Sequence, residues 1–135
     1  MKWKNGEPAI QRLRQTECFL LDMDGTFYLG DNILDGSLEF IQGLRRAGRK
    51  FLFLTNNSSH DAHFYKQRLR KMGCDIERSD IMTSGLAAAS MLKRLHPDGR
   101  VYVLGNEYLK DELNSAGINV VSSSYDVLLA GLQPT

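Results

Sequence analysis

The sequence predicts an α/β fold, in which a parallel, Rossmann-like sheet is followed by the start of a second α/β region. Short apolar runs at 18–21 and 51–54 alternate with longer amphipathic stretches, which is the pattern of strand–helix–strand units. Both runs are apolar at consecutive positions, as expected for parallel strands that are covered on both faces. A helical connection between such strands predicts a right-handed crossover.

The first strand is predicted over 18–22 and the second over 50–55, with a helix between them. The apolar face of this helix is formed by Leu38, Ile41 and Leu44. We expect Ser37 or Asp35 to cap the start of the helix, and Gly48 to follow its end, because these residue types favour those positions.

A second helix is predicted after residue 60, where the polar residues of 56–60 can cap it and Gly73 can end it. Its apolar face is formed by Ala62, Tyr65, Leu69 and Met72. The remaining predicted elements are a helix that ends at Leu95, a strand at 101–105, a helix at 106–116, and strands at 118–121 and 127–130.

Composition excludes several classes of protein. The 135 residues include 42% hydrophobic and 24% charged residues, with a formal net charge of +1, so a disordered or low-complexity chain is excluded. The balanced charge gives no support for a nucleic-acid partner. The apolar runs are far shorter than the roughly 20 residues of a membrane helix, so no membrane association is expected. The cysteines, Cys18 and Cys74, have no metal-type spacing and fit a reducing cytoplasm.

The segment 22–26, Asp-Met-Asp-Gly-Thr, follows directly after the first predicted strand. Residues two apart on an extended chain point the same way, so Asp22 and Asp24 can converge at the carboxyl edge of the sheet, where α/β proteins bind ligands. Two close carboxylates repel each other unless a cation joins them, and Mg²⁺ with phosphate oxygens fits this need. Gly25 allows a sharp turn. The alternative, a simple Asx turn after a strand, is about equally consistent with these five residues alone.

A second polar segment favours the ligand site. Thr55, Asn56 and Asn57 follow the second predicted strand, at the same edge of the sheet, and precede a predicted helix. A hydroxyl, carboxamides and free amide groups at a helix start suit a phosphoryl group. Helix capping by Asn57, Ser58 or Ser59 accounts for part of this segment, but not for Thr55 opposite the aspartate pair.

Together, the segments 22–28 and 51–59 resemble the first two motifs of the haloacid dehalogenase superfamily of phosphohydrolases. The form Thr-Asn-Asn-Ser and the tyrosine after the first motif resemble the nitrophenylphosphatase-like (NagD-like) branch, which carries a large α/β cap after the second motif. The segments 82–89 and 101–113 resemble the start of that cap. The resemblance therefore implies an incomplete Rossmann-like core over residues 1–80 and the start of an α/β cap domain over 81–135.

The resemblance also implies roles for single residues. Asp22 would be the nucleophile that forms an aspartyl phosphate, and Asp24 the general acid and base. Both would hold Mg²⁺, Asp24 through its backbone carbonyl. The phosphoryl group would be bound by Thr55, Asn56 and Asn57, with Gly25 and Thr26 forming the turn beside the nucleophile. The implied activity is Mg²⁺-dependent hydrolysis of a small phosphorylated metabolite in the cytoplasm.

Two further motifs of the superfamily, a lysine and a pair of acidic residues, follow the cap and are expected beyond residue 135. The chain is therefore expected to be the N-terminal portion of a longer phosphatase. The alternative is a catalytically incompetent module that binds phosphate or a partner. The sequence specifies neither the physiological substrate nor the oligomeric state.

Overall fold

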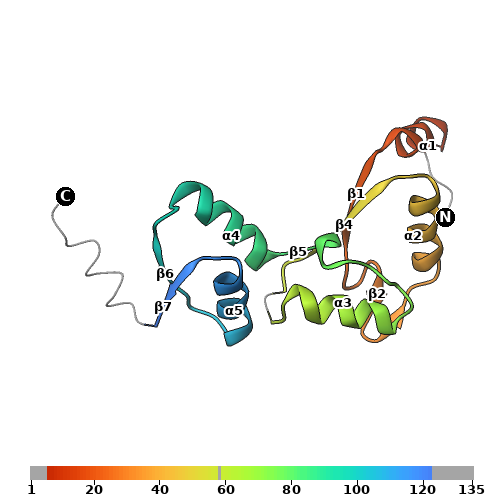
Figure 1. Ribbon diagram of the computed structural model, residues 1–135. Coiled ribbons are helices and arrows are strands. Elements are labelled where there is room, and N and C mark those ends of the chain that lie inside the picture. The colour runs from red at the N-terminus through yellow and green to blue at the C-terminus, as the bar shows by residue number, and fades with distance from the viewer. Residues whose placement is uncertain (1–5, 58, 123–135) are drawn as a thin grey trace. The chain divides into compact units, whose positions relative to one another are not determined.

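The computed structural model describes residues 6–57 and 59–122, and it confirms the mixed α/β class (Figure 1). A three-stranded parallel sheet has the strand order β1-β4-β5, and two smaller sheets are formed by the pairs β2-β3 and β6-β7. The chain divides into two compact units, 1–53 and 54–135, with the boundary inside β4. The assignment of 1–80 to a core and 81–135 to a cap stays a prediction, and the strand predicted at 127–130 lies outside the described residues.

The first unit contains two helices and the strands that follow them. Its elements are α1 (Gly6–Gln15), β1 (Cys18–Asp22), β2 (Tyr28–Leu29), β3 (Asn32–Ile33), α2 (Ser37–Arg46) and most of β4 (Lys50–Thr55). The bounds of β1 and β4 are those predicted from the apolar runs. The sequence analysis did not predict α1, none of whose residues is buried, or the antiparallel pair β2-β3.

The core of the first unit gathers around β4. Its buried hydrophobic side chains are Met23, Phe27, Tyr28, Ile41, Leu44 and Phe53. The rings of Phe27 and Phe53 meet edge to face, with centroids 4.8 Å apart, an arrangement that aromatic pairs prefer. Phe53 is fully buried, so the interior strand supports the segment that follows β1.

The predicted cap of α2 is wrong. The N-cap residue is Gly36, in the left-handed conformation at φ 84°, and neither Ser37 nor Asp35 caps the helix. The hydroxyl of Ser37 instead donates to the carbonyl oxygen of Phe27 at 2.9 Å. The hydroxyl thus ties the start of α2 to the segment after β1. Gly48, at φ 64°, follows the C-cap as predicted.

The expected covering of β1 on both faces is also wrong for the described residues. Exposed and half-buried side chains alternate along β1, and Leu20 is 64% exposed. The apolar run therefore does not mark a strand enclosed on both sides by residues 6–122. It marks a strand with one covered face and one apolar face that reaches solvent.

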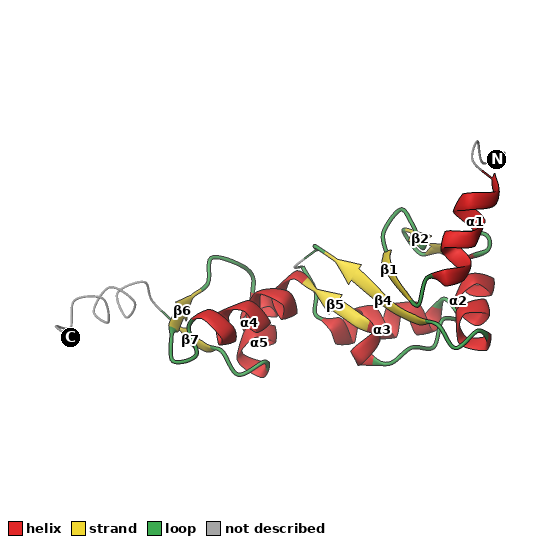
Figure 2. Ribbon diagram, turned by 90° about the horizontal axis from the view of Figure 1, so that it is seen from above, coloured by secondary structure: helices red, strands yellow, loops and turns green. Residues whose placement is uncertain are grey.

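Among the described residues, the second unit contains three α-helices, a 3₁₀ turn and three short strands. Its elements are α3 (Ala62–Lys71), the 3₁₀ turn η1 (Arg78–Asp80), β5 (Ile81–Thr83), α4 (Ser84–Leu95), β6 (Arg100–Tyr102), α5 (Glu107–Ser115) and β7 (Asn119–Val121). Figure 2 shows β6 and β7 beside α4 and α5. The strands β6 and β7 are parallel, with α5 between them in the chain, so they form the predicted strand–helix–strand unit.

Side chains from α4, from α5 and from the residues beside β6 and β7 form one hydrophobic cluster of this unit. Its buried members are Ala89, Val103, Leu113 and Ile118. The helix α5 and the positive-φ residue Gly117 agree with the prediction. The short strand β5 was not predicted.

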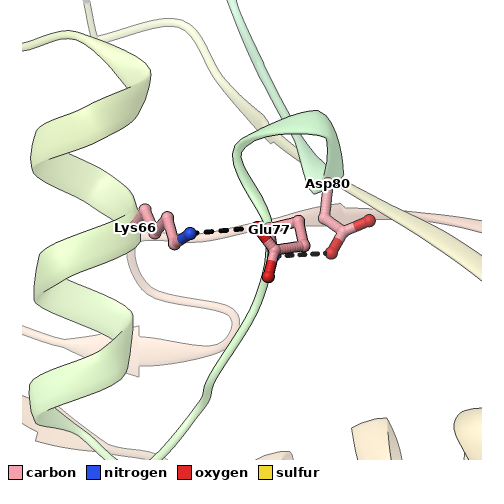
Figure 3. A network of polar contacts seen from close by, with 3 residues as sticks. All are labelled: Lys66, Glu77 and Asp80. Atoms are coloured by element: carbon pink, nitrogen blue, oxygen red, sulfur yellow. Dashed lines mark hydrogen bonds and ion pairs between the residues drawn. The ribbon is translucent and has the colours of Figure 1, made fainter.

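A surface ion pair and a neighbouring hydrogen bond link α3 to the segment that precedes β5. Lys66 on α3 contacts the carboxylate of Glu77 at 3.0 Å, and the amide of Glu77 donates to Asp80 at 2.9 Å (Figure 3). Lys66 is thus paired with an acidic side chain rather than only solvated. On α5, a hydrogen bond from Lys110 to Glu107 raises the pKa of the lysine. Exposed pairs of this kind each contribute at most about 1 kcal/mol.

A buried carboxylate joins the three helices of the second unit. Glu112, on α5, is 5% exposed. Its Oε2 accepts a hydrogen bond from the hydroxyl of Thr83 at 2.7 Å, and its Oε1 accepts one from the amide of Ala62 at 3.3 Å. Thr83 is the N-cap of α4, and Ala62 is the first residue of α3. One side chain of α5 therefore binds the starts of two other helices.

We expect Gly85→Ala to destabilise the protein, although alanine normally favours a helix. A Cβ at Gly85 would overlap Oε2 of Glu112 and lie 3.0 Å from Leu109, so the carboxylate would have to leave its partners. The expected loss is about 1–3 kcal/mol in the free energy of unfolding, measured by urea unfolding.

The matched control for Gly85→Ala is Gly43→Ala in α2. No atom lies within 4 Å of a Cβ built there, so this change should stabilise the protein by up to about 1 kcal/mol. Equal stabilisation by both substitutions would show that Glu112 does not fill the space beside Gly85.

No helix among the described residues is long and apolar enough to cross a membrane. Cys18 and Cys74, both within the described ranges, do not form a disulfide.

Candidate active site

The segment after β1 forms a compact turn that places its polar side chains in solvent. The carbonyl oxygen of Met23 accepts hydrogen bonds from the amides of Thr26 and Phe27, at 3.2 and 2.8 Å. The amide of Gly25 donates to the carbonyl oxygen of Tyr28 at 2.7 Å, with Gly25 at φ 77°. A residue with a Cβ would be strained in that conformation, so the sharp turn depends on Gly25 as predicted.

The two candidate aspartates flank a buried residue. Met23 is 1% exposed, while Asp22 and Asp24 are both exposed. This alternation is what the extended chain predicted for the pair. The hydroxyl of Thr26 donates to Oδ2 of Asp22 at 3.2 Å. Thr26 therefore orients one oxygen of Asp22, in addition to its place in the turn.

These two carboxylates suit a hard cation. Within residues 6–57 and 59–122, no three His, Cys, Asp or Glu side chains are grouped in a way that could hold a metal ion. Mg²⁺, however, commonly uses only one or two carboxylates and completes its shell with water and phosphate oxygens. The exposed pair Asp22 and Asp24 fits that partial shell.

The second group of candidate residues forms a hydrogen-bonded loop after β4. The amide of Asn57 donates to Oγ1 of Thr55 at 3.1 Å, and the amide of Ser59 donates to Oδ1 of Asn57 at 3.0 Å. The hydroxyl of Tyr65, on α3, donates to the carbonyl oxygen of Asn57 at 3.2 Å. Asn56 is exposed beside Thr55. This group, 55–57, belongs to the second unit, whereas the turn 22–26 belongs to the first.

The expectation that residues 56–60 cap the next helix is wrong. The N-cap of α3 is Asp61, whose side chain accepts from the amide of Phe64 at 2.8 Å. The amide of Ala62 is bound by Glu112. The amides of Ala62 and Phe64 therefore have partners inside the protein, and a phosphoryl group at 55–57 would be bound by the loop itself.

The loop also receives support from α5, which the sequence analysis missed. The side-chain amide of Asn106, the N-cap of α5, lies 3.5 Å from the carbonyl oxygen of Ser59. The ring of His60 stacks on Phe64 at 3.7 Å and lies 5.3 Å from that of Tyr108. A helix that comes some 50 residues later in the chain thus packs against the segment after Asn57.

A signal for Glu112 is present in the sequence. Positions 109, 112, 113 and 116 lie on one face of a helix, at the spacing i, i+3, i+4 and i+7. Three of them are Leu109, Leu113 and Ala116, and the fourth is acidic. An acidic residue on an apolar helix face needs a buried partner, so this position marks an internal polar contact.

The turn after β1 places two exposed carboxylates at the end of a parallel strand, the position at which α/β proteins bind ligands. A family model described as haloacid dehalogenase-like hydrolase matches residues 19–119. The chain therefore belongs to the haloacid dehalogenase-like hydrolases, as its two motifs predicted.

Several proteins to which this chain is similar are phosphatases. An acid sugar phosphatase of Staphylococcus epidermidis is 32% identical over 89% of this chain and 47% of its own length. A 4-nitrophenylphosphatase structure from Thermotoga maritima has a TM-score of 0.76 and 37% identity, over 87% of this chain and 50% of that chain. This match confirms the nitrophenylphosphatase-like branch.

A glycerol phosphate phosphatase from Mycobacterium tuberculosis, solved in complex with magnesium, has a TM-score of 0.73 and 31% identity. The match covers 84% of this chain and 34% of that chain. The chain thus spans about half or less of the length of these relatives.

Proposed function

We propose that the protein is a Mg²⁺-dependent phosphatase that hydrolyses small phosphorylated metabolites in the cytoplasm. The observation that carries this proposal is the turn after β1, in which exposed Asp22 and Asp24 flank buried Met23 and Thr26 orients Asp22. Membership of the haloacid dehalogenase-like hydrolases and the phosphatase relatives support it.

In the first step, a carboxylate oxygen of Asp22 attacks the phosphorus atom of the substrate. The bond between phosphorus and the ester oxygen breaks, and the leaving oxygen takes a proton from the carboxyl group of Asp24. The product of this step is an alcohol and an aspartyl phosphate on Asp22. The hydrogen bond from Thr26 to Oδ2 holds the attacking carboxylate in place.

In the second step, Asp24 accepts a proton from a water molecule as the water oxygen attacks phosphorus. The bond between phosphorus and Asp22 breaks, which releases inorganic phosphate and restores both carboxyl groups. Asp22 and Asp24 would hold Mg²⁺, which would supply positive charge that offsets the negative phosphoryl oxygens.

We assign the binding of the phosphoryl oxygens to Thr55, Asn56 and Asn57. The loop is preorganised by its internal hydrogen bonds and by Tyr65, and preorganised donors stabilise charge that develops in the transition state. The amides of Ala62 and Phe64 at the start of α3 are not available to this site, because Glu112 and Asp61 already bind them.

The test is hydrolysis of an aryl phosphate by the full-length protein, with Mg²⁺ and after chelation. We expect turnover with Mg²⁺, loss of turnover to background with excess chelator, and recovery when Mg²⁺ is added back. The protein should stay folded after chelation, because the two carboxylates are exposed and not part of the core, although the loss of a bound ion should lower the unfolding temperature slightly.

A chelated protein that retains full turnover would contradict the metal assignment. Binding of inorganic phosphate without turnover, under all metal conditions, would favour the phosphate-binding module and reject the phosphatase.

A further inference from the structure

We propose that Glu112 is a positioning residue for the phosphate-binding loop 55–57. This inference rests on the proposed function, because it assumes that the loop binds the phosphoryl group. Glu112 is buried and lies outside the catalytic turn, on the helix α5. Its carboxylate binds the start of α3, where the segment that carries Thr55 and Asn57 enters that helix.

The contacts of α5 with this segment form a continuous series. Asn106 contacts the carbonyl oxygen of Ser59, Tyr108 lies beside His60, and Glu112 accepts from Ala62. From the start of α3, the hydroxyl of Tyr65 reaches back to Asn57. The loop therefore contacts α3 directly, through Tyr65, and α5 contacts the residues that follow the loop. Glu112 joins these two helices to each other.

The position of the carboxylate is set by a second contact. Oε2 of Glu112 accepts from the hydroxyl of Thr83, and Oγ1 of Thr83 in turn accepts from the amide of Leu86 at 3.0 Å. Thr83 is 1% exposed. One oxygen of the carboxylate is thus bound at the start of α4, while the other binds Ala62 at the start of α3. The carboxylate cannot shift without losing one of these buried partners.

A carboxylate is the appropriate group for this position. The starts of α3 and α4 both present amide groups and the positive end of a helix dipole, which a negative charge stabilises. An apolar side chain of the same size would leave the amide of Ala62, which is fully buried, without an acceptor. The loop would then be free to move relative to α5.

The test compares three variants of the full-length protein with wild type: Glu112→Ala, Glu112→Gln and Asp111→Asn. Asp111 is the exposed neighbour of Glu112 on α5, so Asp111→Asn is the matched control. The measurements are kcat and KM for an aryl phosphate, the inhibition constant Ki of inorganic phosphate, and the unfolding temperature. All kinetic constants are measured at one temperature, well below the unfolding temperatures of wild type and of each variant.

We expect Glu112→Ala to raise KM and the Ki of inorganic phosphate about tenfold, because small displacements of binding groups are costly. Glu112→Gln keeps one acceptor oxygen and should recover part of this loss, and Asp111→Asn should match wild type. KM and Ki do not depend on how many molecules are folded. A purely structural role of Glu112 would therefore lower the unfolding temperature and leave both constants unchanged.

A second pair of variants covers the case in which Glu112→Ala does not fold. Thr83→Val removes the hydroxyl that anchors the carboxylate, whereas Thr83→Ser keeps it. We expect the Ki of inorganic phosphate to rise severalfold in Thr83→Val and to remain near wild type in Thr83→Ser.

If wild type hydrolyses aryl phosphate but the Glu112 and Thr83 variants keep its KM and Ki, the positioning role is rejected and the phosphatase assignment stands. If wild type neither hydrolyses aryl phosphate nor binds phosphate, the proposed function fails, and the role of Glu112 fails with it.

Discussion

Asp22→Asn is expected to lower the turnover of an aryl phosphate by about 10³-fold or more, since removal of a catalytic nucleophile has effects of this size. Asparagine has nearly the same shape as aspartate but cannot form the aspartyl phosphate. It can still accept the hydrogen bond from Thr26, so the turn should persist. The measurement is kcat with saturating Mg²⁺, together with the unfolding temperature, which should stay close to that of wild type.

The control for Asp22→Asn is Asp35→Asn. Asp35 is exposed and does not cap α2, so this change should leave turnover near the wild-type value. Equal turnover in wild type and Asp22→Asn would remove Asp22 from the mechanism. Equal losses in both variants would indicate a general effect of charge rather than a nucleophile.

Phe53→Ala is expected to lower the free energy of unfolding by about 3–5 kcal/mol, the usual cost of removing a buried aromatic ring. Phe53 is fully buried, and its ring contacts those of Phe27 and Phe51, with centroids 4.8 and 5.7 Å away. Phe27 belongs to the turn after β1, so the cavity would also loosen the support of that turn. Urea unfolding gives the change directly.

Leu20→Ala is the control for Phe53→Ala. Leu20 lies on β1, which is next to β4 in the same sheet, but it is 64% exposed, so its truncation should change stability by no more than about 0.5 kcal/mol. If Leu20→Ala lowered the free energy of unfolding as much as Phe53→Ala, this would show that the exposed face of β1 is covered in solution.

The strands and helices that the sequence predicted well depend on local patterns. Continuous apolar runs defined β1 and β4, and a glycine with positive φ follows both α2 and α5. These signals lie within one element. The aspartate pair was also found locally, because alternation along an extended chain decides which side chains share a face.

The features that the sequence did not predict depend on choices among equivalent residues or on distant contacts. Several residues between Asn56 and Asp61 can cap a helix, and only the tertiary structure selects Asp61. The hydroxyl of Ser37 was expected to cap α2, but it binds Phe27, ten residues earlier. Glu112 binds Ala62 across 50 residues, so its partner is recognisable only once the helices are packed.

The contact between Glu112 and Ala62 has a consequence for the order of folding. During synthesis, the loop 55–57 and the start of α3 leave the ribosome long before α5 is made. Contacts between residues that are far apart in the sequence form later than local contacts. The amide of Ala62 therefore forms its hydrogen bond with Glu112 only after α5 has been made. The candidate phosphate loop would therefore reach its final geometry only after about 50 further residues have emerged and α5 has docked.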